Sequence, residues 1–383
     1  MSGAASGRAS PRRASSDGAT SDEYWMTRAC ELALLGLNTT TPNPRVGCVI
    51  VNASGDLIAE GWHRKAGGVH AEVDALQQAG ADTRGASVYV TLEPCNHQGR
   101  TGPCTEALIA AGVSEVIYGM EDPNPLVSGR GLARLRAAGI TVRGPVLEEQ
   151  VRALNPGFIR RMTSERPWVR CKMAMSLDGR TAMASGESFW ITGEAARADV
   201  QHWRARSCAI VTGIGTVLHD DPALTVRDPA LGEDPRQPLR VVVDSRLRLP
   251  PEARLLRMAG DTIVATCALN RPHLGAEIWG MPSVAGAVDL DALVHKLAKR
   301  GCNEVLVEAG PGLSGTFLRA GLVDELIIYM APKLLGSSAR PLFDLPLDFM
   351  TQAVQLEITD ARPIGADWRY VMRVVPTAPP TFG

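Results

Sequence analysis

The feature that most constrains this chain is one histidine and two cysteines that must meet in the fold although they lie apart in sequence. They are His70, Cys95 and Cys104, and each cysteine directly follows a proline. An imidazole and two thiolates are good zinc ligands, and three protein ligands leave the fourth tetrahedral position open for water. An open position is typical of a catalytic zinc site. The fold must therefore bring these three side chains around one ion.

The acid two positions after the histidine is Glu72, which we expect to carry protons rather than to bind the metal. The order His-x-Glu followed by Pro-Cys is typical of zinc deaminases. Zinc lowers the pKa of its bound water to about 7, and Glu72 can take a proton from water and deliver it to leaving ammonia. Singly, Cys95 and Cys104 fit ordinary buried residues. The whole set, with a strand-like run at 87–92 leading into Cys95, favours the zinc site.

Eight residues separate the two cysteines, whereas the commonest form of this signature has two. Glycine and proline predict a loop for this insert. His97, Arg100 and Thr101 supply cationic and hydrogen-bonding groups of the kind that hold a phosphate. We therefore expect a phosphorylated small-molecule substrate. The alternative for His97 and Arg100 is a solvated loop.

Composition limits the class of protein and its partners. A length of 383 residues predicts two domains. A net charge of −1 and the lack of a basic block argue against nucleic acid as a partner. No run approaches about 18 apolar residues, so we expect no contact with a membrane. The eight scattered cysteines favour reduced thiols in a cytoplasmic protein over a disulfide framework.

The chain divides into four predicted parts. Residues 1–21 are mainly Ser, Gly and Ala and are expected to be a disordered tail, with a transit peptide as the second interpretation. Alternating strands and helices predict a three-layer α/β domain at 22–165, which carries the zinc signature, and a second α/β domain at 166–376. Residues 377–383 are expected to be a loose tail. We interpret 156–166 as a polar, basic connector.

Hydrophobic periodicity and turn residues predict the individual elements. In the domain at 22–165 we expect helices at 22–36, from His70 onward, at 105–111 and at 132–138, with strands at 46–51, 87–92, 113–119 and 140–143. In the domain at 166–376 we expect a helix at 193–206, strands at 168–173, 209–212, 240–244, 262–266, 304–308 and 324–331, and hairpin strands near 356–358 and 370–372. A Gly-rich turn at 309–316, before a helix at 317–320, suits an anion, although a tight turn fits it equally well.

Together these motifs resemble the bifunctional deaminase/reductase family of riboflavin biosynthesis over residues 22–375. The matching runs are 41–47, 70–72, 91–104, 122–125, 172–192, 220–225, 308–311 and 331–336. The resemblance implies a cytidine-deaminase-like domain followed by a dihydrofolate-reductase-like domain. It implies loss of the 2-amino group from a diaminopyrimidinone ribosyl phosphate, then NADPH reduction of the ribosyl unit to a ribityl chain. Two departures are Gly102, where the family commonly has proline, and the extra N-terminal tail.

The resemblance also implies roles for particular residues. The zinc (Zn²⁺) ligands correspond to His70, Cys95 and Cys104, with Glu72 as proton carrier, in agreement with the reasoning above. It places NADPH near Ala174, Trp190, Thr216, Asp220, Ser245, Gly310, Pro311, Gly312, Leu313, Ser314, Gly315 and Thr316. It places substrate near Ser188, Arg204, Leu224, Arg227 and Glu308 in the reductase domain, and we add Asn43, His97 and Arg100 in the deaminase domain.

Several alternatives remain open at this point. Trp190 also fits a core residue, Arg204 a solvated helix face, and Asp220 and Ser245 caps. A nucleic-acid-editing zinc deaminase is a second hypothesis, which the neutral charge and the phosphate-suited insert disfavour. A non-catalytic scaffold held by zinc is a third. Shared pathway logic favours a homo-oligomer, but no sequence feature specifies its size.

Overall fold

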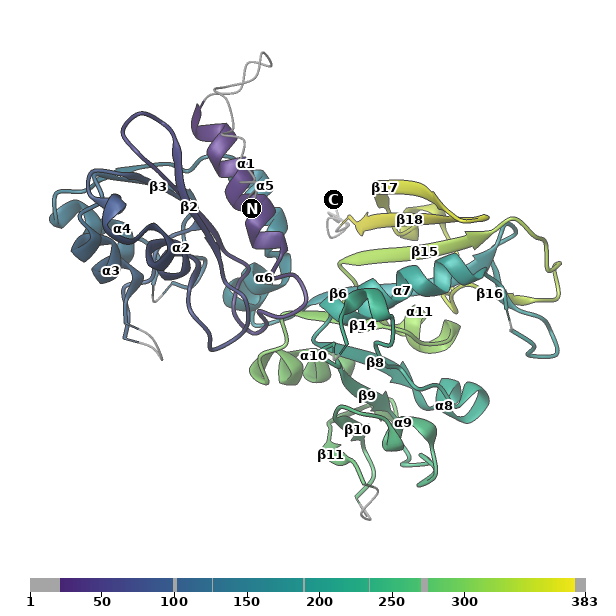
Figure 1. Cartoon of the computed structure of the whole chain (residues 1–383). Coiled ribbons are helices and arrows are strands. Elements are labelled where there is room, and N and C mark those ends of the chain that lie inside the picture. The colour runs from purple at the N-terminus through teal and green to yellow at the C-terminus, as the bar shows by residue number, and fades with distance from the viewer. Residues whose placement is uncertain are drawn as a thin grey trace, which may run out of the picture. The chain divides into compact units, whose positions relative to one another are not determined.

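The computed structural model describes residues 21–98, 102–125, 127–188, 190–233, 235–269 and 275–375. The chain forms two compact units, Met1–Thr163 and Ser164–Gly383, and each has its own sheet and core (Figure 1). The helices in the described ranges are all too short or too polar to cross a membrane.

The first unit is built on a five-stranded mixed sheet in the order β2-β1-β3-β4-β5. Strand β1 pairs antiparallel with β2 and β3, and β4 and β5 continue the sheet in parallel with β3. All five residues of β1 are buried, as expected for a strand covered on both faces. The bounds are β1 Gly47–Val51, β2 Leu57–Trp62, β3 Ser87–Leu92, β4 Glu115–Met120 and β5 Thr141–Arg143.

Helices cover both faces of this sheet, which confirms the predicted three-layer α/β architecture. Figure 1 shows α1, α5 and α6 on one side and α2, α3 and α4 on the other. The bounds are α1 Ser21–Leu34, α2 Ala71–Ala79, α3 Cys104–Ala111, α4 Arg130–Ala137, α5 Glu148–Leu154 and α6 Pro156–Ser164, with the 3-10 turn η1 at Gly80–Thr83. Helix α1 begins at Ser21, one residue inside the predicted tail.

One prediction for this unit was wrong, and two elements were not predicted. Strand β2 and helix α5 were missed, and the predicted connector at 156–166 is mostly the helix α6. Pro156 occupies the first position of this helix, where its missing N–H costs nothing. Ile159 packs against the core of the unit, so tertiary packing stabilises a segment whose polar composition suggested a linker.

The second unit contains a nine-stranded sheet in the order β11-β10-β9-β8-β14-β6-β15-β18-β17. The first seven strands of this order are parallel, and β18 and β17 add an antiparallel hairpin to β15. The bounds are β6 Trp168–Ser176, β8 Ala209–Gly213, β9 Leu239–Val243, β10 Thr262–Thr266, β11 Glu277–Gly280, β14 Glu304–Val307, β15 Glu325–Ala331, β17 Leu356–Ile364 and β18 Asp367–Val374.

Short strands and helices complete this unit. Strand β7 (Arg180–Ala182) pairs with β16 (Arg340–Pro341), and β12 (Ser283–Val284) pairs with β13 (Ala287–Val288). The helices are α7 Glu194–Arg206, α8 Ile214–Asp220, α9 Arg254–Arg257, α10 Leu290–Lys299 and α11 Pro311–Arg319, with 3-10 turns η2 Pro229–Leu231 and η3 Met350–Gln352. Because the central strands are parallel, their carboxyl ends meet at one edge of the sheet, where ligands bind in open α/β folds.

The predicted Gly-rich turn at 309–316 is helical over most of its length, because α11 begins at Pro311. Gly310 caps the helix in an extended conformation. Gly315 lies inside this helix, and a Cβ atom at its position would come within 2.2 Å of the carbonyl oxygen of Asp344. Close packing, rather than loop flexibility, therefore explains this glycine, and the anion-binding feature that survives is the helix N-terminus.

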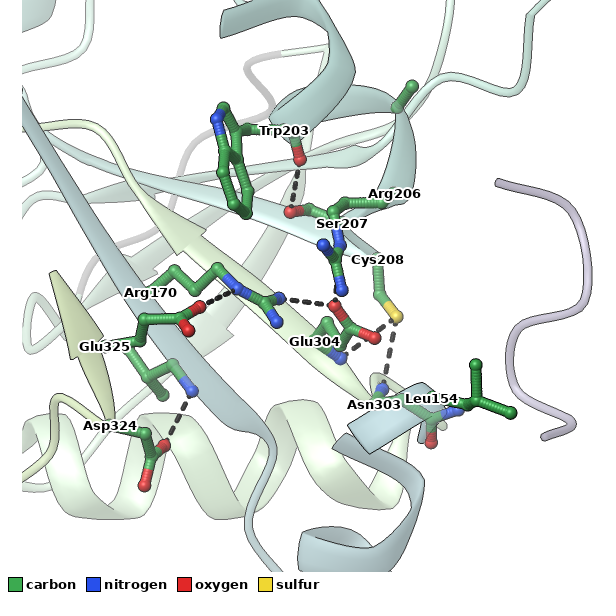
Figure 2. A network of polar contacts seen from close by, with 12 residues as sticks. Leu154, Arg170, Trp203, Arg206, Ser207, Cys208, Asn303, Glu304, Asp324 and Glu325 are labelled. Carbon is green, nitrogen blue, oxygen red and sulfur yellow. Dashed lines mark hydrogen bonds and ion pairs between the residues drawn. The ribbon is translucent and has the colours of Figure 1, made fainter. Parts of the chain in front are cut away.

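A buried ion network joins three strands near their amino ends. Arg170 on β6 is paired with Glu304 at the start of β14 and with Glu325 at the start of β15 (Figure 2). The side chains of Arg170 and Glu304 are 3% and 1% exposed, so each charge depends on its partner. Arg206 at the end of α7 also binds Glu304, with 3.2 Å between Nε and Oε2. The network therefore locks β6, β14 and β15 together.

We expect Arg170→Met to destabilise the second unit by about 3–5 kcal/mol, because it leaves the buried carboxylate of Glu304 without its main partner. Arg373→Met makes the same change in an exposed pair with Glu357 and should cost about 0–1 kcal/mol. Chemical denaturation followed by fluorescence and circular dichroism measures both. Equal effects of the two variants would contradict the structural role of the network.

Candidate active sites

The predicted zinc ligands come from three segments of the first unit. His70 is the residue before α2 and has an extended backbone, and Cys104 is the first residue of α3. Cys95 lies in the loop after β3. Helices α2 and α3 contact each other, so their N-termini bring the imidazole and one thiol together. Helix N-termini favour negative charge, which suits a thiolate.

The three side chains form a compact donor set. His70 Nδ1 lies 3.2 Å from Cys104 Sγ and 3.5 Å from Cys95 Sγ, and all three ligand atoms lie within 4.8 Å of one another. Nitrogen and sulfur atoms bound to one tetrahedral zinc ion are about 3.6 Å apart. The geometry therefore fits zinc, and the His-Cys-Cys site predicted from the sequence is confirmed.

Local hydrogen bonds prepare Cys95 for metal binding. Hydrogen bonding from Cys104 outweighs the effect of burial and, with help from His70, lowers the pKa of Cys95 to about 4. The backbone N–H of Cys104 also points at Cys95 Sγ, at 3.5 Å. The pKa of His70 is raised, chiefly by its hydrogen bond with Cys95. The lowered pKa of Cys95 favours the thiolate, the form that binds metals, whereas the hydrogen bond with Cys95 and burial raise the pKa of Cys104.

Glu72 lies in the first turn of α2 and is almost completely buried. Burial raises the pKa of its carboxyl group to about 7, and the negative charge of Cys95 acts in the same direction. A carboxyl group that titrates near neutral pH can both accept and donate a proton during one reaction. The arrangement therefore suits proton transfer beside the metal ligands.

His63 is a residue of this site that the sequence reasoning missed. Its Nδ1 donates to the carbonyl oxygen of Val69 at 2.8 Å, and Nε2 accepts from Asn43 Nδ2 at 3.1 Å. Burial lowers the pKa of His63, which favours this neutral tautomer. Its ring packs edge to face on His70, with 5.5 Å between centroids. His63 therefore holds Asn43 near the ligands; no spacing pattern in the sequence signals that role.

The insert between the cysteines is anchored at its start. Thr105 Oγ1 donates to Asn96 Oδ1 at 2.8 Å, which ties the insert to α3. His97 is exposed. Arg100 and Thr101 lie outside the described residues.

The second unit places an ion cluster at the carboxyl end of β14. Arg204 donates to both carboxylate oxygens of Glu308, at 2.6 and 2.9 Å. Lys172 Nζ lies 3.5 Å from Oε2 of the same carboxylate. Burial alone would raise the pKa of Glu308, but the charges of Arg204 and Lys172 lower it to about 2. Arg204 is therefore not a solvated helix residue. Lys172, which the sequence reasoning did not assign, completes the cluster.

Arg227 lies close to this cluster. Its main-chain N–H donates to Gln201 on α7 at 3.0 Å, and its side chain is exposed. Partial burial, and then the positive charges of Arg204 and Arg254, lower the pKa of Arg227. Several cations thus meet here, which suits an anionic ligand.

The other predicted reductase residues lie in the same unit with different surroundings. Trp190 is 63% exposed, which excludes a core role, and Arg197 lies 4.4 Å from its ring centroid. Ser245 Oγ accepts the N–H of Val288 at 3.0 Å, and Asp220 contacts His219 Nδ1 at 2.7 Å. The remaining positions are Ala174 on β6, Ser188 before α7, Thr216 on α8, buried Leu224 with φ 48°, and Gly310 to Thr316 at the start of α11.

Comparison with known proteins assigns a family to each unit. Residues 19–120 match the cytidine and deoxycytidylate deaminase zinc-binding region, and residues 167–370 match the RibD C-terminal domain. The riboflavin biosynthesis protein RibD of Escherichia coli is 49% identical over 358 residues, covering 90% of this chain and 97% of that protein. The corresponding protein of Haemophilus influenzae is 46% identical, covering 90% and 95%.

Two solved structures share the whole architecture. Acinetobacter baumannii RibD has a TM-score of 0.86 and 46% identity, covering 93% of this chain and 99% of that one. A Thermotoga maritima diaminohydroxyphosphoribosylaminopyrimidine deaminase/5-amino-6-(5-phosphoribosylamino)uracil reductase has a TM-score of 0.84 and 35% identity, with the same coverage. The predicted pairing of a cytidine-deaminase-like domain with a dihydrofolate-reductase-like domain is thereby confirmed.

A zinc-binding deaminase unit joined to a reductase unit defines a bifunctional enzyme. The chain belongs to the RibD family and carries out the deaminase and reductase steps of riboflavin biosynthesis, with zinc and NAD(P)H as cofactors. The nucleic-acid-editing and scaffold hypotheses are therefore wrong.

Cys104→Ser should reduce bound zinc from about one ion per chain to a small fraction, because one of three protein ligands is lost. Cys30→Ser alters a half-buried thiol of α1 in the same unit and should retain zinc. Elemental analysis of the purified variants measures the metal. Full zinc content in Cys104→Ser would contradict the assigned site.

Proposed function

We propose that the first unit removes the 2-amino group of a diaminopyrimidinone ribosyl phosphate, and that the second unit then reduces the ribosyl unit of the product with NADPH. The observation that carries the first step is Glu72, a buried carboxyl group with a pKa of about 7, beside three zinc ligands. The first step is assigned to residues 22–165 and the second to residues 166–376, with residues 1–21 and 377–383 as tails.

In the deamination, Glu72 moves the protons. When bound, zinc supplies Lewis acidity that makes water a better nucleophile at neutral pH. The Glu72 carboxylate takes a proton from the attacking water and delivers it to the departing amino group, which leaves as ammonia. Asn43, held by His63, is positioned to orient the pyrimidine. His97 and Arg100 are assigned to the substrate phosphate.

In the reduction, the hydride comes from the cofactor and the protein supplies orientation and charge. We assign NADPH to the carboxyl edge of the sheet, with the N-terminus of α11 facing a cofactor phosphate. The contacts are Ala174, Trp190, Thr216, Asp220, Ser245 and Gly310 to Thr316. Substrate contacts are assigned to Ser188, Arg204, Leu224, Arg227 and Glu308.

The two arginines differ in what they can do for the substrate. Arg204 donates hydrogen bonds to Glu308 and to the carbonyl oxygen of Thr225. Its guanidinium group is therefore fixed in the wall of the site and is less suited to bind the phosphate. Arg227 is exposed beside it and is better suited to take the phosphate.

Glu72→Gln should lower the rate of ammonia release by about 10²–10⁴-fold, because the amide cannot carry the proton. Zinc content should stay at the wild-type level. The decisive assay pairs ammonia release with NADPH oxidation, starting from either the diaminopyrimidinone or the deaminated intermediate. The variant should oxidise NADPH normally only with the deaminated intermediate. Undiminished ammonia release by Glu72→Gln would remove Glu72 from the mechanism.

Arg227→Gln should raise the KM of the reductase for its phosphorylated substrate by about tenfold, the effect of losing roughly 1.4 kcal/mol of a charged hydrogen bond. The KM for NADPH should not change. Arg300→Gln, an exposed arginine directly after α10, is the control. Steady-state kinetics with the deaminated substrate separates the two constants. An unchanged substrate KM would place the phosphate elsewhere.

We also propose that the protein is a homo-oligomer that associates through the hairpin β17–β18. The supporting observation is an apolar face on this hairpin, where Leu356, Ile358 and Trp368 are 41%, 60% and 42% exposed. Exposed apolar patches on soluble domains commonly mark interfaces. Sedimentation of the wild type should give a mass that is a multiple of the protomer mass. The Ile358→Glu variant should give a smaller mass, because the charge weakens the interface. A wild-type monomer at micromolar concentration would contradict the proposal.

Two further assignments concern the setting of the enzyme. We propose a cytoplasmic location, which the eight free cysteines support. The partners are the phosphorylated pyrimidine and the cofactors, without nucleic acid or membrane.

A further inference from the structure

Glu93 is a buried carboxylate whose partners are backbone N–H groups of one distant connection. It lies two residues before a zinc ligand and is 3% exposed. Oε2 accepts from Asp122 at 3.1 Å and from Gly129 at 2.9 Å. Oε1 accepts from Gly131 at 2.9 Å and from Leu132 at 3.4 Å. Burying a carboxylate is costly unless it is hydrogen-bonded, so these four donors compensate for its desolvation.

The bonds from Glu93 replace a missing helix cap. Helix α4 follows Gly129, which has no side chain to accept the first N–H groups of the helix. Gly131 in the first turn packs so closely that a Cβ atom would lie 2.0 Å from the carbonyl oxygen of Pro94. The start of α4 therefore rests directly on the segment that leads to Cys95.

The same carboxylate ties down the other end of the connection between β4 and α4. That end carries Asp122, whose Oδ1 accepts the N–H of Asn124 at 2.8 Å and shapes a tight turn. Burial raises the pKa of Asp122, and the hydrogen bond from the N–H of Asn124 opposes this effect. The negative charges of Glu93 and Cys95 raise the pKa further, whereas His97 lowers it. The Asp122 turn is therefore joined through Glu93 to the segment that carries Cys95.

We infer that Glu93 is a positioning residue for the deamination step, whose carboxylate places the Asp122–Asn124 turn at the rim of the pyrimidine site. The inference rests on the proposed deaminase function. Glu93 joins a turn near the substrate, a helix start and a zinc-ligand segment through one side chain. Outer groups that orient a metal site commonly contribute about 10–100-fold to its affinity or activity.

The test compares Glu93→Gln with Glu106→Gln in the zinc-loaded full-length enzyme. Glutamine keeps the shape of Glu93 but turns an NH₂ group toward two of the four N–H donors. Glu106 also binds helix α4, through Arg134 Nε at 2.7 Å, but at the exposed surface. We expect Glu93→Gln to raise the deaminase KM about tenfold with kcat nearly unchanged, because the turn contributes to binding and not to proton transfer. Glu106→Gln should have the deaminase kinetics of the wild type. Both variants should keep the zinc content and the reductase activity of the wild type.

Asp122→Ala provides a second variant that leaves Glu93 and the zinc ligands intact. It should raise the same KM, and the double variant should be less impaired than the product of the two single effects, because both act through one turn. Multiplicative effects would overturn the inference, as would a loss of zinc in Glu93→Gln or wild-type kinetics in that variant.

Amide hydrogen exchange measures the hydrogen bonds to the Glu93 carboxylate without requiring turnover. The amides of Asp122, Gly129, Gly131 and Leu132 should exchange faster in Glu93→Gln and not in Glu106→Gln. Unchanged exchange would overturn the inference. A wild-type enzyme that releases no ammonia would contradict the proposed function instead, and the exchange data would still decide whether Glu93 holds the turn.

Discussion

The first unit depends on the meeting of His70, Cys95 and Cys104, which come from three segments joined by the packing of α2 and α3 on one sheet. Two of the three ligands stand at helix N-termini, where negative charge is stabilised. Hydrogen bonds lower the pKa of Cys95 to about 4, while burial raises that of Glu72 to about 7. The pKa of Cys95 and the pKa of Glu72 are thus shifted in opposite directions at neighbouring positions. The first shift suits a thiolate ligand, and the second suits a proton carrier.

The second unit separates stability from function along the same strands. Arg170, Glu304 and Glu325 form a buried network near the amino ends of β6, β14 and β15 (Figure 2). Glu308 follows the carboxyl end of β14, where Arg204 holds it. Parallel strands make this division possible, because every strand presents the same end to the same edge. Substitutions at the amino ends should therefore affect folding first, whereas those near Glu308 affect binding.

Much of the fold and the metal site could be predicted because the signals are local or depend on residue type. Alternating patterns identified most strands, and the pairing of one histidine with two proline-preceded cysteines identified the ligands. Lys172 and His63 escaped prediction because a single lysine or histidine carries no spacing signal. Glu93 lies in a recognised run, yet its four N–H donors come from residues 122–132 and are visible only in three dimensions.

The sequence by itself determined which residues can bind zinc and which nearby carboxyl group can carry protons, because these properties belong to the side chains. It also determined the two-part α/β organisation through its hydrophobic periodicity. Only the tertiary structure decided that the residues after Gly310 form a helix, that residues 156–164 pack as α6, and that Glu72 is buried enough to titrate near neutral pH. Packing and desolvation depend on distant neighbours, which no local pattern encodes.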